Sequence, residues 1–112
     1  MTTLRQAVRE YVRMRRDLGF KFHEPGKRLL DFVQFMEQHR ASYITQALAL
    51  AWAQQPPHVQ PARWAQRLSF VRGFARYRSA TDPRTEIPAL RRNRWWLEVV
   101  TGREFGDGAL MG

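Results

Sequence analysis

The chain has 112 residues, of which 44% are hydrophobic and 12% aromatic, so we expect one domain with a buried core. It contains no cysteine, which excludes disulfides and thiolate metal sites, and its three histidines are too scattered to indicate a metal site. Nineteen Lys and Arg against ten Asp and Glu leave a net charge of +9. Such an excess favours a nucleic-acid partner over the alternative explanation, a GC-rich genome that encodes arginine often.

The positive charge is almost entirely arginine, with lysine only at Lys21 and Lys27. Arginine binds phosphate through two parallel N–H donors, which suits an anionic partner. The N-terminus is already charged at Arg5 and lacks the apolar run of a secretion signal or a membrane span. We therefore expect a cytoplasmic protein with no membrane partner, no cofactor and no small-molecule substrate.

The first predicted helix runs over residues 4 to 18 and is ended by Gly19. Its apolar face consists of Leu4, Ala7, Val8, Tyr11, Met14 and Leu18. A stripe beside that face consists of Arg5, Arg9, Arg13 and Arg16. Arginines four residues apart repel by roughly 0.2–0.5 kcal/mol per pair, a penalty that a bound polyanion would remove. A solvated face, partly neutralised by Glu10 and Asp17, is an equally good interpretation of the stripe alone.

The second helix is predicted to start at Pro25 and to end near His39 and Arg40. Its core face consists of Leu29, Phe32, Val33 and Met36. The basic turn at its start consists of Lys21, Lys27 and Arg28. The third helix is predicted from an N-cap at Thr45 to Gln55, where two prolines stop it. Its alanines indicate close helix packing, with Trp52 as a core anchor.

The fourth helix, Pro61 to about Ser79, is predicted to carry two separate apolar faces and thus to pack on two sides. One face is Trp64, Leu68, Val71 and Ala75, and the other is Phe70, Phe74 and Tyr77. Between them we expect a corridor of Ala62, Ala65, Gln66, Ser69, Arg72, Gly73 and Arg76. We interpret this corridor as a DNA-contacting surface, with Arg72 and Arg76 reaching phosphates or guanine edges. Packing against a further helix is the alternative.

Four segments resemble, in order and spacing, the N-terminal core-binding domain of the tyrosine recombinases, or phage-integrase family. They are LRQAVREYVRMRRDLGFKF, RLLDFVQFMEQH, ITQALALAWA and RLSFVRGFARYRSATDPRTEIP. The most specific piece is the pattern R-L-S-x-x-R-x-F-x-R-Y, here Arg67, Leu68, Ser69, Arg72, Phe74, Arg76 and Tyr77, followed by Asp82 and Pro83. The resemblance covers residues 4 to 88.

The resemblance implies an all-α, SAM-like four-helix domain that clamps one side of a recombination site in double-stranded DNA, with other recombinase subunits as further partners. The family's separate C-terminal domain cuts the strands with a tyrosine, arginines and a His-x-x-Arg motif. No histidine here is followed by arginine at the third position. We therefore expect no catalytic residue, and interpret Tyr11, Tyr43 and Tyr77 as packing residues.

The expected DNA-binding residues come from the first helix, the basic turn and the fourth helix. They are Arg5, Arg9, Arg13, Arg16, Lys21, Lys27, Arg28, Gln66, Ser69, Arg72 and Arg76. Phosphate contacts should dominate affinity.

After Pro88 the sequence departs from the family pattern. We expect residues 1–88 to fold as the DNA-binding domain, and 89–112 to be a tail or linker remnant. A short helix over Ala89 to Val100 and a disordered tail are the two alternatives for this part. The favoured origin is a truncated or frameshifted recombinase gene. A designed domain boundary and a true short protein remain the alternatives.

A different class of function is a protein-interaction module for synaptic assembly, or a regulator of a full-length recombinase, with Trp95 and Trp96 as an exposed partner site. Steep salt dependence of duplex binding would separate DNA binding from this function. Binding to an anionic membrane surface is less well supported, because the first helix has no Trp or Phe on its apolar face.

Overall fold

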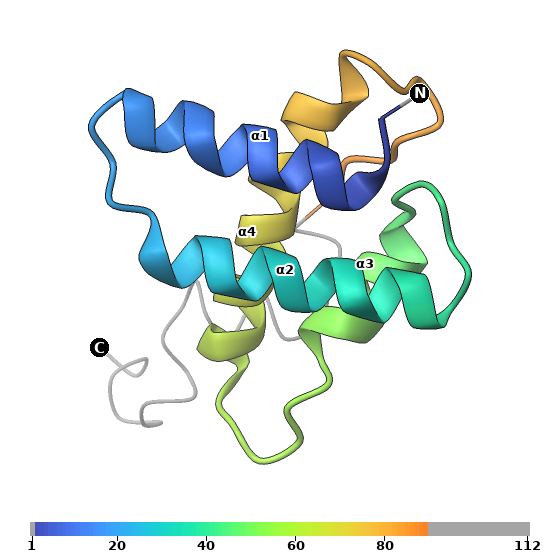
Figure 1. Ribbon diagram of the computed structural model, residues 1–112. Coiled ribbons are helices and arrows are strands. Elements are labelled where there is room, and N and C mark those ends of the chain that lie inside the picture. Colours follow the sequence, from blue (N-terminus) through green and yellow to red (C-terminus); the bar gives the residue numbers. More distant parts are fainter. Residues whose placement is uncertain (1, 90–112) are drawn as a thin grey trace.

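The computed structural model describes residues 2–89 and confirms an all-α fold for this part of the chain, in which no strand occurs. Its four helices are α1 (Leu4–Asp17), α2 (His23–Gln38), α3 (Gln46–Ala53) and α4 (Pro61–Ser79). α1 and α2 lie side by side and run in opposite directions, α4 crosses behind both, and α3 packs beside α4 (Figure 1). No helix within these residues is both long and apolar enough to cross a membrane.

The helix ends follow local hydrogen bonding. α1 starts with a capping box in which Gln6 N donates to Thr3 Oγ1 at 3.1 Å and Thr3 N donates to Gln6 Oε1 at 3.0 Å. It is followed by Gly19 with φ of +102°, as expected. Thr45 caps α3 through a 3.2 Å bond from Leu48 N, which confirms the predicted N-cap.

The prediction that α2 begins at Pro25 is wrong by two residues, because the chain reverses earlier at Phe22. That residue has φ of 58° in the left-handed region, and α2 begins directly after it at His23. Pro25 then falls within the first turn, where its missing N–H is no loss. The Arg15 guanidinium lies 5.4 Å from the Phe22 ring centre, and Tyr11 meets the same ring edge-on at 5.6 Å, so packing from α1 supports the strained turn.

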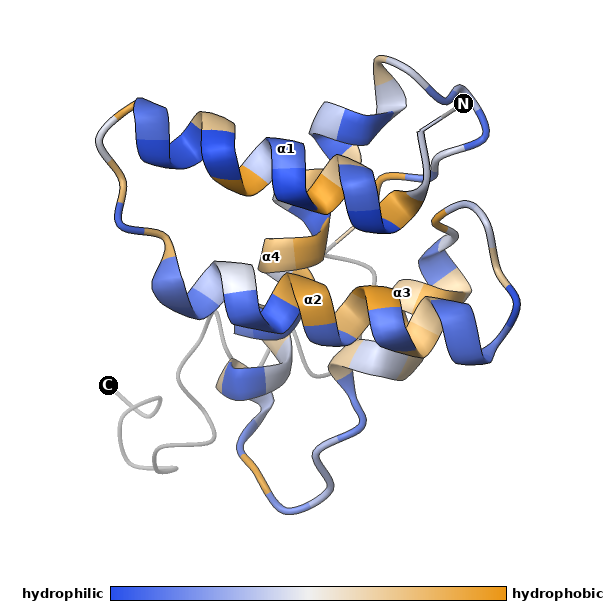
Figure 2. Cartoon of the chain, viewed as in Figure 1, coloured by the Kyte–Doolittle hydropathy of each residue, from blue (hydrophilic) through white to orange (hydrophobic). Residues whose placement is uncertain are grey.

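The core lies where the inner faces of α1, α2 and α3 meet α4 (Figure 2). Phe32 of α2 and Trp52 of α3 pack edge to face at 5.3 Å, and both are fully buried. The other fully buried large side chains include Val8, Leu29, Val33, Met36, Ile44, Leu68, Val71 and Phe74. All four helices therefore share one core.

α1 approaches α4 closely at Gly73. A Cβ atom added to Gly73 would lie 2.9 Å from the Tyr11 hydroxyl, closer than side chains tolerate. The Tyr11 ring is itself buried against two aromatic rings of α4, with Phe74 at 5.6 Å and Tyr77 at 5.2 Å. At Gly73 the small residues of the corridor therefore serve helix packing, the alternative to the DNA interpretation.

The expectation of two separate apolar faces on α4 is wrong, because two buried arginines join them. At about 100° per residue, Arg67 and Arg78 fall between the Leu68–Val71–Ala75 side and Phe74. Both arginines are buried, with 7% and 6% of their surface exposed. α4 thus presents one broad buried face to the other three helices.

The chain after α4 is fastened back onto the domain. Arg84 donates to both Asp82 oxygens, at 3.0 and 2.9 Å, while Arg78 Nη2 lies 3.9 Å from Asp82 and donates to Thr2 O at 2.8 Å. These contacts bring the N-terminus to the end of α4.

Residues 86–89 lie along the start of α3. Glu86 N donates to Ile44 O at 2.9 Å, Ala89 N donates to Gln46 Oε1 at 3.1 Å, and Arg72 Nη1 donates to Pro88 O at 2.7 Å. The residues around the predicted boundary at 88 therefore belong to the fold. The tail helix and the Trp95–Trp96 site lie outside the described residues, and the boundary stays a prediction.

Replacing Phe74 by Ala should lower the free energy of unfolding by about 3–5 kcal/mol, because a fully buried ring between α1 and α4 is lost and a cavity remains. Urea unfolding followed by circular dichroism measures the change. Val59→Ala, at a residue 38% exposed, should change stability by no more than about 0.5 kcal/mol. Equal effects of the two substitutions would contradict this core.

Asp82 should make stability sensitive to acid. The side chain and backbone of Arg84 hydrogen-bond the carboxylate and lower the Asp82 pKa from 3.8 to about 2. A lowered folded-state pKa stabilises the fold above the unfolded pKa, and this contribution is lost as the pH falls from about 4 through 2. The stability difference between the wild type and Asp82→Asn should therefore shrink over that range. A difference independent of pH in acid unfolding curves would refute the role of the charge.

Candidate nucleic-acid interface

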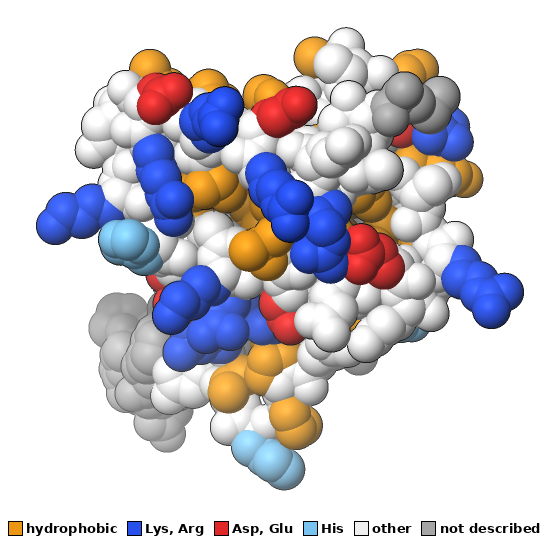
Figure 3. Space-filling model, viewed as in Figure 1, with side chains coloured by type: hydrophobic (Ala, Val, Ile, Leu, Met, Phe, Trp, Pro, Cys, Tyr) orange, Lys and Arg blue, Asp and Glu red, His pale blue; other side chains and the backbone are white. Residues whose placement is uncertain are grey.

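A basic groove of about 510 Å³ lies between α1 and α2. Its lining residues are Val8, Arg9, Val12, Arg13, Arg16, Asp17, His23, Gly26, Lys27 and Leu30. The space-filling view shows Lys and Arg side chains gathered over α1 and α2 on this face, with hydrophobic side chains between them (Figure 3). Gly26 adds no side chain to the groove, and a Cβ atom at this position would be in ordinary van der Waals contact with Val12 at 3.7 Å.

The groove carries four permanent cations against one carboxylate, that of Asp17. Arg9, Arg13 and Lys27 are exposed, and they form no hydrogen bond or ion pair with any other residue in the range 2–89. Arg16 donates from Nε to Lys21 O at 3.2 Å, so it also holds the turn before α2. The structure therefore brings together Arg9, Arg13, Arg16 and Lys27 of the predicted set.

The remaining basic residues near the groove lie on its flanks, and two are already paired. Arg5 donates to both oxygens of Glu37, at 2.7 and 3.0 Å, which raises the Arg5 pKa and lowers the Glu37 pKa. Arg28 Nε lies 2.7 Å from Glu24, whose pKa is lowered by that hydrogen bond. Lys21 is exposed in the turn. Such surface pairs are weak and can open for a phosphate.

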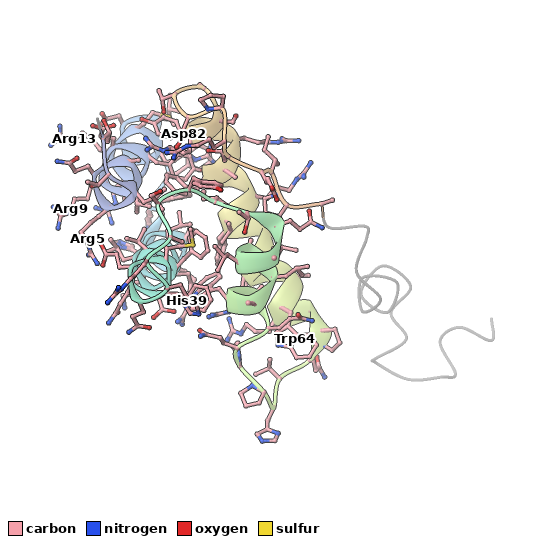
Figure 4. The ribbon with its side chains drawn as sticks, turned by 90° about the vertical axis from the view of Figure 1, so that its right-hand side faces the viewer. Arg5, Arg9, Arg13, His39, Trp64 and Asp82 are labelled. Atoms are coloured by element: carbon pink, nitrogen blue, oxygen red, sulfur yellow. The ribbon has the colours of Figure 1, made fainter. Side chains whose placement is uncertain are left out.

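The corridor of α4 lies on a different side of the molecule. On the helical wheel Arg76 points away from the arc that packs on the other helices. Arg5, Arg9 and Arg13 extend from α1 away from α4 (Figure 4). The predicted residues thus form two surfaces, and one straight duplex segment cannot contact both.

The corridor itself is only partly free. Gln66, Ser69 and Arg76 are exposed, and the Ser69 hydroxyl donates to Gln66 O at 2.9 Å. Arg72 is half-buried and holds the chain at Pro88. Packing at Gly73 and the bond from Arg72 leave Arg76 as the corridor's exposed cation, which makes the α1–α2 groove the stronger candidate.

Arg67 is a buried cation that sequence reasoning did not place in the core. Its guanidinium stacks over the Trp52 ring at 3.8 Å and donates from Nη2 to Trp52 O at 2.8 Å. Burial lowers the Arg67 pKa, and Asp31 acts against that shift. Asp31 also accepts from Trp52 Nε1 at 2.9 Å. Arg67 and Trp52 are 15 residues apart in the chain and come together only in the folded domain, so no sequence signal placed Arg67 in the core.

The tyrosines occupy packing positions, as interpreted from the sequence. Burial raises the Tyr11 pKa, and Tyr77 packs on the Tyr11 ring at 5.2 Å. Tyr43 is more exposed and lies under the Arg84 guanidinium at 4.7 Å. In the described part of the chain, no three His, Asp or Glu side chains come together as a metal site.

The fold and the groove define a small, basic, all-α domain. Its sequence is similar to that of a longer protein from Sinorhizobium fredii (strain NBRC 101917 / NGR234), named "Putative integrase/recombinase y4rB", with 58% identity over 88 residues. The match covers 79% of this chain, and the chain spans 28% of the length of that relative. No protein-family model and no solved structure matches. The similarity relates the chain to integrases and recombinases, in line with the resemblance drawn from its motifs.

Replacing Arg67 by Met should lower the free energy of unfolding by about 1–3 kcal/mol, because the apolar stem is kept while the stack of the guanidinium on Trp52 and its hydrogen bond to Trp52 O are lost. Urea unfolding monitored by tryptophan fluorescence measures this. The exposed neighbour Arg63, changed to Met in the same way, should shift stability by no more than about 0.5 kcal/mol. If Arg67→Met is equally harmless, the stacked guanidinium contributes nothing to the fold.

Proposed function

We propose that this chain is a DNA-binding module of a tyrosine-type recombinase that holds double-stranded DNA against the α1–α2 groove and performs no chemistry of its own. The observation that carries the proposal is the convergence of Arg9, Arg13 and Lys27 on one open groove without partners in residues 2–89. Similarity to part of a protein named as an integrase/recombinase supports the same conclusion.

The groove suits a phosphate backbone better than a base edge. Arg9, Arg13 and Arg16 lie on α1, and Lys27 lies on α2. The apolar residues Val8, Val12 and Leu30 line the groove between the two helices. An apolar floor keeps water away and strengthens the attraction between an arginine and a phosphate. Contacts of this kind fix the position of the duplex and carry little sequence information, so binding should be tolerant of sequence and steeply salt-dependent.

The proposal assigns DNA binding and strand cleavage to different domains. Strand cleavage and rejoining belong to a recombinase catalytic domain, and we assign no catalytic role to any described residue. We also propose residues 1–88 as the unit that binds DNA, with the chain beyond it as a tail or linker. The corridor residues Gln66, Ser69 and Arg76 would contact DNA only if the duplex bends around the domain.

A second candidate is a contact with other recombinase subunits, and one observation favours it. Leu18 and Phe20, in the turn between α1 and α2, are 65% and 50% exposed. Arg15 lies over the Phe20 ring at 4.3 Å and covers one of its faces. An apolar pair at a protruding turn is a typical protein-contact element, and such a contact would be insensitive to salt.

Fluorescence anisotropy with a duplex oligonucleotide at several salt concentrations tests the proposal. The wild type should show a steep linear decrease of log K with log salt, with a slope of about −0.9 per phosphate contacted. The triple variant Arg9→Gln, Arg13→Gln, Lys27→Gln should bind more weakly at every sequence, and its slope should be shallower by roughly 2–3.

Arg40→Gln is the matched control, because Arg40 is exposed at the end of α2 and does not line the groove. It should leave both affinity and slope close to the wild type. Arg76→Gln tests the corridor in the same assay. If Arg76→Gln flattens the slope while the groove variant binds normally, DNA lies on α4 and the proposed interface is wrong.

A further inference from the structure

A second and smaller pocket, of about 120 Å³, lies where the start of α2 meets the start of α4. Its walls are Arg28 of α2, Arg63 and Arg67 of α4, and Pro56 and Val59 of the loop between α3 and α4. The volume is several times the roughly 30 Å³ that one water takes up in the liquid. It is therefore large enough for a single tetrahedral oxyanion.

Arg67 gives this pocket a fixed wall. The side chain is 7% exposed, and the Trp52 stack and the bond to Trp52 O hold its guanidinium in one orientation. Its buried Nε has no hydrogen-bond partner among residues 2–89. A buried N–H without an acceptor is costly, so this cation is desolvated and incompletely satisfied before any ligand arrives. A preorganised arginine of this kind binds an oxyanion with little loss of side-chain entropy.

The charges around the pocket favour an anion. Arg28 and Arg63 lie close enough to Arg67 to lower its pKa, after the larger effect of burial, and Asp31 opposes them. Glu24 offsets part of Arg28 through its 2.7 Å ion pair. Three arginines against these two carboxylates leave one net positive charge, to which Lys27 adds a second. Mutual repulsion among the arginines disappears when an anion binds between them.

The start of α4 adds to the same field. No acidic residue lies in its first turn, and Gln60 at the N-cap makes no side-chain capping bond. The positive end of a 19-residue helix dipole therefore faces the loop that forms the pocket rim, and no acidic residue of the first turn of α4 offsets it.

The pocket and the α1–α2 groove share no lining residue, but they are neighbours along α2. Lys27 lines the groove and Arg28, the next residue, lines the pocket, and consecutive Cα atoms are about 3.8 Å apart. A strand of DNA carries one phosphate per roughly 3.4 Å along the helix axis, so a strand bound at Lys27 brings a neighbouring phosphate toward Arg28. We infer that Arg28, Arg63 and Arg67 form a seat for one backbone phosphate of the bound duplex, an inference that rests on the proposed function.

The test compares Val59→Glu with Val59→Gln in the full-length chain. The two side chains have nearly the same shape, and only glutamate places a negative charge at the pocket rim. Duplex binding by Val59→Glu should be weaker by about fivefold relative to Val59→Gln, the factor that one unit-charge repulsion at about 4 Å in water produces. Arg63→Gln should flatten the salt slope by about 0.9, whereas Arg40→Gln should leave it unchanged.

Nuclear magnetic resonance of the arginine side chains identifies the ligand. Saturating duplex should shift the Arg67 guanidinium signal in Val59→Gln and leave it in place in Val59→Glu. Inorganic phosphate at constant ionic strength should produce the same shift only at far higher concentration.

Three results would overturn the inference. The first is equal duplex binding by the two Val59 variants, and the second is an Arg67 signal that duplex does not move. The third is a shift of that signal by inorganic phosphate at a concentration as low as that of the duplex, which would assign the pocket to free phosphate. If the pocket variants bind normally while the groove triple variant is impaired, only this inference fails. If both bind normally, the proposed function fails as well.

Discussion

The position of Trp52 is the constraint on which the rest of this domain depends. Its ring contacts Phe32 of α2 on one side and the Arg67 guanidinium of α4 on the other, while its indole N–H is bonded to Asp31. A single residue of the short helix α3 therefore fixes α2 against α4. α1 packs on this pair through Leu4, Ala7, Val8 and Tyr11, and the gap left on the outer side between α1 and α2 becomes the basic groove. The groove is thus a product of core packing rather than of a loop.

The sequence predicted the helices because their signals are local. Thr45, Gly19 and Pro61 mark helix ends through their own backbone preferences, and α1 has an apolar face with a clear period. The buried face of α4 was harder to predict. Arg67 and Arg78 lie in the middle of it and divide its apolar residues into two groups on the helical wheel. A helical wheel drawn from sequence places every arginine on the exposed side. Arg67 and Arg78 are buried because tertiary partners, Trp52 O and Thr2 O, accept their hydrogen bonds.

The candidate site was predicted in part for the same reason. The arginine stripe of α1 was found because its members share one helix, and three of the four line the groove. The fourth, Arg5, is paired with Glu37, which lies 32 residues away in the chain. Arg72 was expected to face DNA, but its partner Pro88 lies beyond the end of α4. Arg28 and Arg63 gained a joint role only when α2 and α4 came together. Contacts between residues far apart in the sequence therefore determine which arginines are free to bind an anion.

The hydrogen bonds of residues 86–89 also determine on which side of the domain this segment ends. Bonds from Arg72, Glu86 and Ala89 hold this segment against α3 and against the side of α4 that faces away from the other helices. The segment that ends at Ala89 therefore lies at the rear of the domain, behind the surface that bears Arg9 and Arg13. A fluorescent protein or an affinity tag fused there would leave the groove unobstructed. If the groove binds DNA as proposed, a covalently joined second domain would have to reach around the body of this one to contact the same stretch of duplex, so the two domains would hold it from opposite sides.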